Sequence, residues 1–125
     1  TLDKGIETVL WAFKNMVGGE VFVPKIPSIK IIDLIKTIKP NAKIKLIGIR
    51  PGEKIDEHMI TTTDGQNTYE LDNYYIIMNN FNIDLKNKFL KLHKNASLVK
   101  EGFEYRSNLN NFLKNSEIKN LIKKI

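Results

Sequence analysis

The chain has 125 residues, no cysteine and a formal net charge of +6, with 42% hydrophobic and 27% charged residues. These values are typical of one soluble globular domain or part of a larger one. The absence of cysteine excludes disulfides, thiolate catalysis and Cys-type zinc sites. No apolar run reaches the roughly 18 residues that a membrane-spanning helix needs, and no signal-peptide pattern opens the sequence. Because the chain starts at Thr1, already inside a helix-like pattern, we expect a fragment or an excised domain.

The basic charge comes mainly from lysines that are spread along the whole chain, and asparagine is also abundant. This distribution favours a compositional bias, since a nucleic-acid surface more often combines clustered Arg with exposed aromatic side chains. A small basic module that binds nucleic acid or a partner protein remains the alternative function at this point.

The first expected helix covers residues 2–16, with Thr1 as its N-cap and Gly18-Gly19 at its end. Its apolar residues fall at helical spacing, namely Leu2, Ile6, Val9, Leu10 and Phe13. Of these, Leu10 and Phe13 are expected to pack in the core. Trp11 lies off this stripe, so it is either partly exposed or packed on a second surface.

A short β run at 20–23 leads into the loop Pro24-Lys25-Ile26-Pro27-Ser28, which its two prolines hold extended. We expect Ser28 to cap a helix from Ile29 to about Lys39, with Ile31 in its first turn. A loop that feeds a helix N-terminus is a place where anions can bind.

Residues 43–49 alternate in the manner of a strand. We expect this run to lie parallel to 20–23 in one sheet, with the intervening helix as a right-handed crossover. A short helix is expected over 54–60, and 68–71 with 74–78 predict a hairpin. The order of these elements indicates an α/β or α+β fold with a thin sheet.

The later part of the chain is less regular. Residues 80–95 show only weak helical periodicity. The final helix is clearer, with Asn115 or Ser116 as its cap and apolar residues at i, i+3, i+4 and i+7, namely Ile118, Leu121, Ile122 and Ile125.

The turn Gly48–Lys54 holds charged side chains at a corner built by Pro51 and Gly52. Arg50 offers a planar fork that suits two phosphate oxygens, and Glu53 can accept hydrogen bonds from a ribose diol. With Ile31 as an apolar wall, this set suits a nucleoside diphosphate. The alternative is a solvated turn with an ordinary surface ion pair.

The sequence shows no recognisable catalytic or metal-binding pattern. His58 and His93 have no second His or Cys at metal-ligand spacing. The chain contains no Gly-rich phosphate loop, no Tyr-x-x-x-Lys pair and no nucleophile with an adjacent base. From these residues alone the chain cannot be called an enzyme.

The motifs in order resemble the C-terminal part of the inverting UDP-N-acetylglucosamine 4,6-dehydratases, extended short-chain dehydrogenase/reductases of surface-sugar biosynthesis. The Pro-Lys-Ile-Pro-Ser loop and Arg-Pro-Gly-Glu-Lys carry most of this resemblance. It covers residues 1–5, 19–28, 48–54, 68–77 and 101–108. One departure is Phe112-Leu113-Lys114, where the family usually has Trp-Leu-Ser/Thr.

The resemblance implies an α/β fold in which residues 1–125 form a single sugar-nucleotide-binding region, a small sheet with flanking helices. The Rossmann half, the NADP site and the catalytic residues are expected before Thr1. The 125-residue chain alone would then bind no NADP and have no dehydratase activity. A degenerate, non-catalytic remnant remains open.

The resemblance also implies roles for individual residues. Arg50 would contact the UDP phosphates, Glu53 the uridine ribose and Ile31 the region of the uracil, while Lys25 is a further expected contact. The parent enzyme would be cytoplasmic and homo-oligomeric, with a UDP-sugar substrate and neither a membrane nor a nucleic acid as partner.

Overall fold

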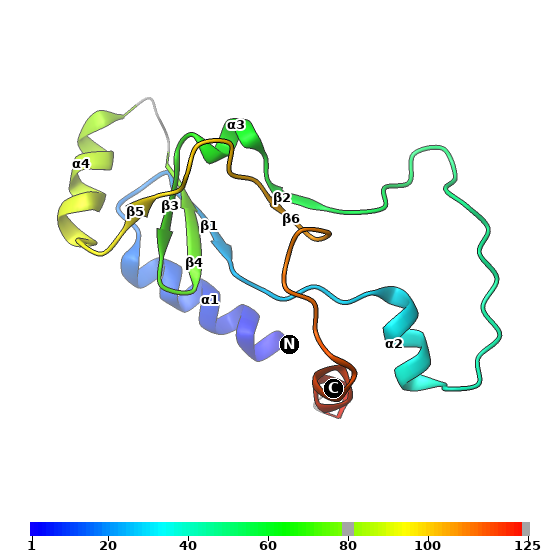
Figure 1. Ribbon diagram of the computed structural model, residues 1–125. Coiled ribbons are helices and arrows are strands. Elements are labelled where there is room, and N and C mark those ends of the chain that lie inside the picture. The colour runs from blue at the N-terminus through cyan, green and yellow to red at the C-terminus, as the bar shows by residue number, and fades with distance from the viewer. Residues whose placement is uncertain (79–81, 124–125) are drawn as a thin grey trace. The chain divides into compact units, whose positions relative to one another are not determined.

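The computed structural model describes residues 1–78 and 82–123 (Figure 1). These residues form two compact units, each built from two separate stretches of the chain. The first unit contains Thr1–Lys25 and Met59–Glu104, and the second contains Ile26–His58 and Tyr105–Ile125.

The first unit is built on a four-stranded sheet in which every neighbouring pair is antiparallel. Its strand order is β1-β4-β3-β5, with β1 at Val21–Pro24, β3 at Thr68–Leu71, β4 at Tyr74–Ile77 and β5 at Ser97–Leu98. The predicted hairpin is therefore confirmed as β3 and β4. Its turn places Asp72 at a φ of 50°, a left-handed conformation that Asp tolerates better than most residues.

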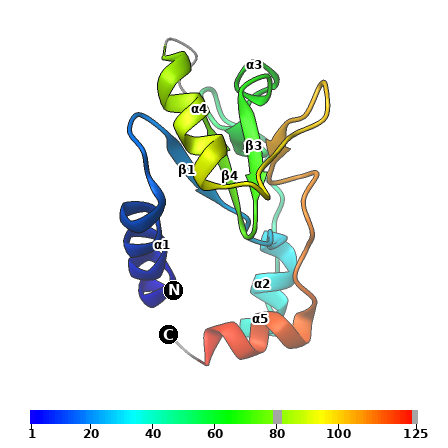
Figure 2. The same ribbon diagram turned by 90° about the vertical axis from the view of Figure 1, so that its left-hand side faces the viewer.

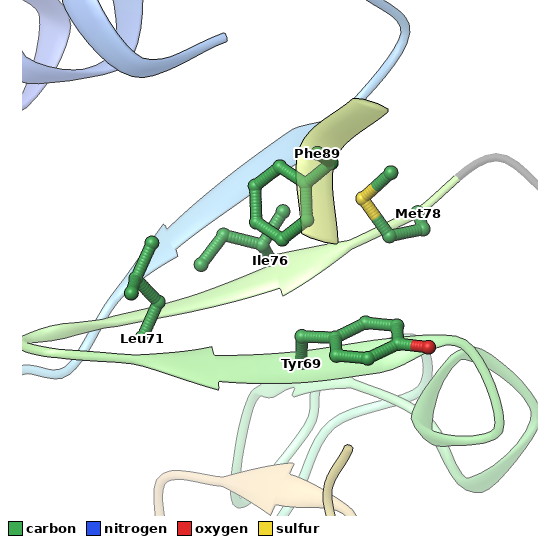
Figure 3. Packing of buried hydrophobic residues seen from close by; sticks show 5 residues of the cluster. All are labelled: Tyr69, Leu71, Ile76, Met78 and Phe89. Atoms are coloured by element: carbon green, nitrogen blue, oxygen red, sulfur yellow. The ribbon is translucent and has the colours of Figure 1, made fainter. Parts of the chain in front are cut away.

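Two helices cover one face of this sheet (Figure 2). Helix α1 (Leu2–Asn15) stacks Trp11 on Tyr74 with ring centroids 4.0 Å apart. Helix α4 (Ile83–Leu92) places Phe89 over Tyr69 at 6.3 Å. The buried cluster between helix and sheet consists of Tyr69, Leu71, Ile76, Met78 and Phe89 (Figure 3).

The opposite face of the sheet carries α3 (Thr62–Gly65) and the segment that contains Phe103. The Phe103 ring lies 4.9 Å from that of Tyr75, centroid to centroid. A side chain on Gly65 would overlap the backbone carbonyl of Phe103, so the contact requires a glycine here.

The second unit packs α2 (Ile31–Ile38) against α5 (Asn115–Ile122), in which Ile118 is fully buried. A two-stranded sheet of β2 (His58–Ile60) and β6 (Tyr105–Arg106) includes residues of both stretches at which the chain passes from one unit to the other, so it is not assigned to the second unit alone. The final helix is confirmed, although Asn115 is its first residue and Lys114 its N-cap. The predicted apolar position Ile125 lies outside the described residues.

The predicted cap of the helix after the Pro-Lys-Ile-Pro-Ser loop is wrong. The helix begins at Ile31 after an N-cap at Lys30, which makes no side-chain capping bond. Ser28 is engaged elsewhere, because its N–H donates to the Asn111 carbonyl at 2.8 Å and its own carbonyl accepts from Leu113 at 2.9 Å. These two bonds hold Ser28 in an extended conformation that a helix could not adopt.

The predicted parallel sheet is also wrong. Strand β1 pairs with β4 and is antiparallel to it, and residues 43–49 form no strand. The expected helix over 54–60 is replaced by a loop and by β2 (Figure 1). A strand exists only as part of a hydrogen-bonded ladder, and in the described part of the chain 43–49 pairs with no neighbour.

Helix α1 has nearly the predicted bounds and the predicted cap, since the Thr1 hydroxyl accepts from the Lys4 N–H. Its orientation differs from the expectation. Leu10 and Phe13 are 64% and 71% exposed, while Trp11 is half-buried on the sheet. The second surface left open for Trp11 is therefore the one that packs, and the stripe with the predicted core residues Leu10 and Phe13 faces outward.

Candidate functional site: the turn Gly48–Lys54

The turn has the local geometry that its sequence predicts. Residues Pro51 and Gly52 form the bend, and Gly52 has a φ of 86°, which favours glycine. The Glu53 N–H closes the turn on the Arg50 carbonyl at 3.0 Å. Arg50 and Glu53 are thereby brought onto one side of a four-residue corner.

The side chains of this corner form a close pair. Arg50 donates from Nε to Glu53 Oε1 at 2.7 Å, and its terminal Nη2 lies 2.6 Å from the same oxygen. Glu53 Oε2 accepts from the Arg50 backbone N–H at 2.9 Å. These hydrogen bonds, the backbone one foremost and then that of the guanidinium, lower the pKa of Glu53 below its ordinary value. Glu53 is therefore a carboxylate at neutral pH.

The pair leaves part of the guanidinium available. Glu53 engages two of the three guanidinium nitrogens, and the Arg50 side chain is 74% exposed. The remaining N–H groups can reach an anion while Glu53 holds the fork in a fixed orientation. The same geometry is also that of a surface ion pair.

Ile31 is the first residue of α2 and its side chain is 66% exposed. It lies in the same unit as Arg50 and Glu53 but outside their hydrogen-bonded pair. Among the described residues, the stretch of chain between α2 and the start of β2 has no helix or strand. Ile31 is thus an accessible apolar surface, as an apolar wall for a base requires.

Lys25 lies in the first unit, where its ammonium group has several partners. It contacts Glu70 Oε1 at 2.6 Å and donates to the Asp72 carbonyl at 2.7 Å. It also lies 4.9 Å from the centre of the Tyr75 ring, a cation–π distance. These contacts tie the end of β1 to the β3–β4 hairpin, which gives Lys25 a structural role of its own.

The loop before α2 is held by two side chains that the residue patterns did not single out as positioning groups. The Tyr105 hydroxyl donates to the Ile26 carbonyl at 2.7 Å and accepts from the Ile26 N–H at 2.9 Å. Asn110 donates to the same carbonyl and, at 3.3 Å, to Ser28 Oγ. The sequence signal was the loop at 102–108, whose aromatic residues Phe103 and Tyr105 are expected to act as anchors, although the pattern did not identify Ile26 as the partner of Tyr105.

Replacing Tyr105 by Phe tests this clamp. The change leaves the Ile26 N–H without its partner, so we expect the local opening of the loop at Ile26 to become easier by about 1–2 kcal/mol, with little change elsewhere in the unit. Hydrogen exchange of the Ile26 amide should become about 5- to 30-fold faster. The Ser28 amide, which bonds to Asn111, is the internal reference. Equal acceleration at both amides would mean that Tyr105 stabilises the unit only as a whole.

Neither histidine lies in a metal centre. Within residues 1–78 and 82–123, no group of three or more His, Asp or Glu side chains could hold an ion. His58 lies 3.5 Å from Asp56, which Arg106 also contacts at 2.9 Å. His93 Nε2 is 3.0 Å from the Asn15 carbonyl and its ring packs on Phe89. The contacts of both histidine side chains are therefore ones that a structural role explains.

The described residues do not fit a dinucleotide cofactor. Such a site is built where a Gly-rich turn joins a strand to a helix in a parallel sheet. The four-stranded sheet of this chain is antiparallel throughout, and the loop before α2 contains prolines where that motif has glycines.

Residues 1–79 match the family described as polysaccharide biosynthesis protein. The chain belongs to this family. It is similar to two proteins named UDP-N-acetylglucosamine 4,6-dehydratase (inverting), from Campylobacter jejuni subsp. jejuni serotypes O:2 and O:23/36. The identities are 45% and 43% over 113 residues, or 88% of this chain. The chain spans 34% of each of these relatives.

A solved structure is similar to this chain over nearly all of its length. The X-ray structure of Pen from Bacillus thuringiensis superimposes with a TM-score of 0.77 at 30% identity, over 99% of this chain and 37% of Pen. The family match and the two dehydratases confirm the resemblance seen in the motifs. The fold is a small mixed α/β arrangement with antiparallel sheets. None of the described helices is long and apolar enough to cross a membrane.

Proposed function

We propose that this chain is the UDP-sugar-binding part of an inverting UDP-N-acetylglucosamine 4,6-dehydratase that acts in bacterial surface-sugar biosynthesis. The observation that carries the proposal is the 45% identity, over 88% of the chain, to a protein of that name. The family match over residues 1–79 includes the Arg-Pro-Gly-Glu-Lys turn, and that turn presents an exposed, oriented guanidinium.

In this proposal Arg50 binds the pyrophosphate of UDP, and Glu53 both orients Arg50 and accepts from the ribose hydroxyls. Ile31 packs against the uracil. Lys25 is a further contact to the nucleotide, which would have to share its ammonium group with Glu70 and the Asp72 carbonyl. The charge, the acceptor and the apolar surface correspond to the three chemical parts of a uridine diphosphate.

The proposal includes NADP, held by a Rossmann part outside the residues of this chain, together with a cytoplasmic location and a homo-oligomeric enzyme. These features follow from the family resemblance. The comparisons lend no support to the alternative of a basic nucleic-acid or protein-binding module, because the matched relatives named above are dehydratases.

The test uses a joined protein, in which this chain replaces the matched third of the Campylobacter jejuni serotype O:2 dehydratase. We expect the joined protein to turn over UDP-N-acetylglucosamine and the 125-residue chain with added NADP to show no turnover, because hydride chemistry belongs to the cofactor and its binding part. The dehydratase lacking its matched third is the control.

Turnover by the 125-residue chain alone would contradict the assignment of the catalytic groups to another part of the enzyme. A joined protein that is folded but neither binds UDP nor turns over substrate would identify this chain as a degenerate remnant.

A further inference from the structure

Helix α1 has one face that is packed and one face that is exposed. One face packs on the sheet of the first unit through half-buried residues at helical spacing, namely Thr8, Trp11, Ala12 and Asn15. Trp11 stacks on Tyr74, and the Asn15 carbonyl lies 3.0 Å from His93 Nε2. This face alone accounts for the attachment of α1 to the unit.

The other face is apolar and exposed. We call it the α1 stripe, and its members are 50–81% exposed: Leu2, Ile6, Val9, Leu10 and Phe13. These positions fall within about 100° of one another around the helix and extend along roughly 16 Å of its axis. A continuous apolar stripe on a helix is the pattern of a buried face, and exposed patches of this kind mark interaction surfaces.

One border of the stripe is charged with both signs. Asp3, Glu7 and Lys14 lie between the stripe and the packed face, and Lys4 forms a 2.6 Å ion pair with Glu7. An apolar centre with a polar, solvated rim is the usual composition of a protein interface. On this side the charged residues limit how far an apolar partner surface could extend around the helix.

We propose that the α1 stripe docks onto the cofactor-binding part of the dehydratase. The relatives contain a large region that this chain lacks, because the chain spans 34% of the dehydratases it matches and 37% of Pen. About two thirds of such a protein therefore lies outside the matched region and is large enough to cover the stripe. The nature of the occupant rests on the proposed function, whereas the docking of the stripe is tested separately.

The chain contains no cysteine, so one introduced thiol reports on one position. Val9→Cys places the thiol in the stripe and Lys14→Cys places it on the charged border, both at exposed positions where a small side chain preserves the helix. Maleimide labelling is followed by mass spectrometry of the α1 peptide, in the 125-residue chain and in the joined protein.

In the 125-residue chain we expect positions 9 and 14 to react at similar rates. In the joined protein the rate at position 9 should fall at least about tenfold, while that at position 14 should change little. An unchanged rate at position 9 in the joined protein would overturn the proposal. Protection already present in the isolated chain, lost on dilution and accompanied by a dimer in light scattering, would assign the stripe to a second copy and also overturn it.

The outcome is independent of the proposed activity. Protection of position 9 in a joined protein without turnover keeps the docking surface and rejects the dehydratase function of this chain. Turnover by a joined protein in which position 9 stays unprotected keeps the dehydratase function and rejects the docking surface.

Discussion

Phe89→Ala will lower the free energy of unfolding of the first unit by about 3–5 kcal/mol. The Phe89 side chain has no solvent exposure and lies on the sheet beside Tyr69, Ile76 and Met78 (Figure 3). Without the ring, the protein loses the favourable free energy of transferring it from water to the core. The substitution also leaves a cavity that α4 and the strands cannot fill completely. A domain is stable by about 5–15 kcal/mol, so this change removes a large share.

Urea unfolding followed by the fluorescence of Trp11 measures this effect. Trp11 is the only tryptophan of the chain and stacks on Tyr74 in the same unit, so its signal reports on this sheet. Leu92→Ala is the matched control, because Leu92 lies in the same helix and is 58% exposed. We expect the control to shift the midpoint little. Comparable losses from both variants would place the core elsewhere than on α4.

Arg50→Ala will weaken UDP binding to the joined protein about 10- to 150-fold. The expected loss is that of a charge-assisted contact to the pyrophosphate, worth about 1.5–3 kcal/mol. Arg50→Lys should recover only part of the affinity, since a point charge cannot reproduce the planar fork. Calorimetric titration of UDP into the wild-type joined protein and the two variants gives the three affinities.

Glu53→Gln separates the proposed roles of the pair. We expect it to weaken UDP more than inorganic pyrophosphate, because its proposed partner is the ribose and pyrophosphate has none. Removing the carboxylate also removes the negative charge that now engages Arg50, which acts against any loss of pyrophosphate binding. Equal UDP affinities of wild type and Arg50→Ala would mean that the turn holds only a surface ion pair, which contributes little to stability.

Features that depend on near neighbours along the chain followed from the sequence. The Thr1 cap, the hairpin around Asp72 and the bend at Pro51-Gly52 are set by the conformational preferences of a few adjacent residues. The pairing of Arg50 with Glu53 belongs to this class, since a three-residue separation across a tight turn brings the two side chains together. The family was likewise recognisable from motifs, which the relatives confirm.

Only the tertiary structure decided which surfaces meet. The periodicity of α1 identifies an apolar stripe, but the aromatic stacking of Trp11 on Tyr74 holds the opposite face against the sheet. Strand β1 could not be assigned its antiparallel partner β4, because pairing depends on a ladder formed with residues about 50 positions away. Residues 43–49 alternate in the manner of a strand but form none. Alternation only sorts the side chains onto two faces, whereas the backbone hydrogen bonds of a strand require a neighbouring strand.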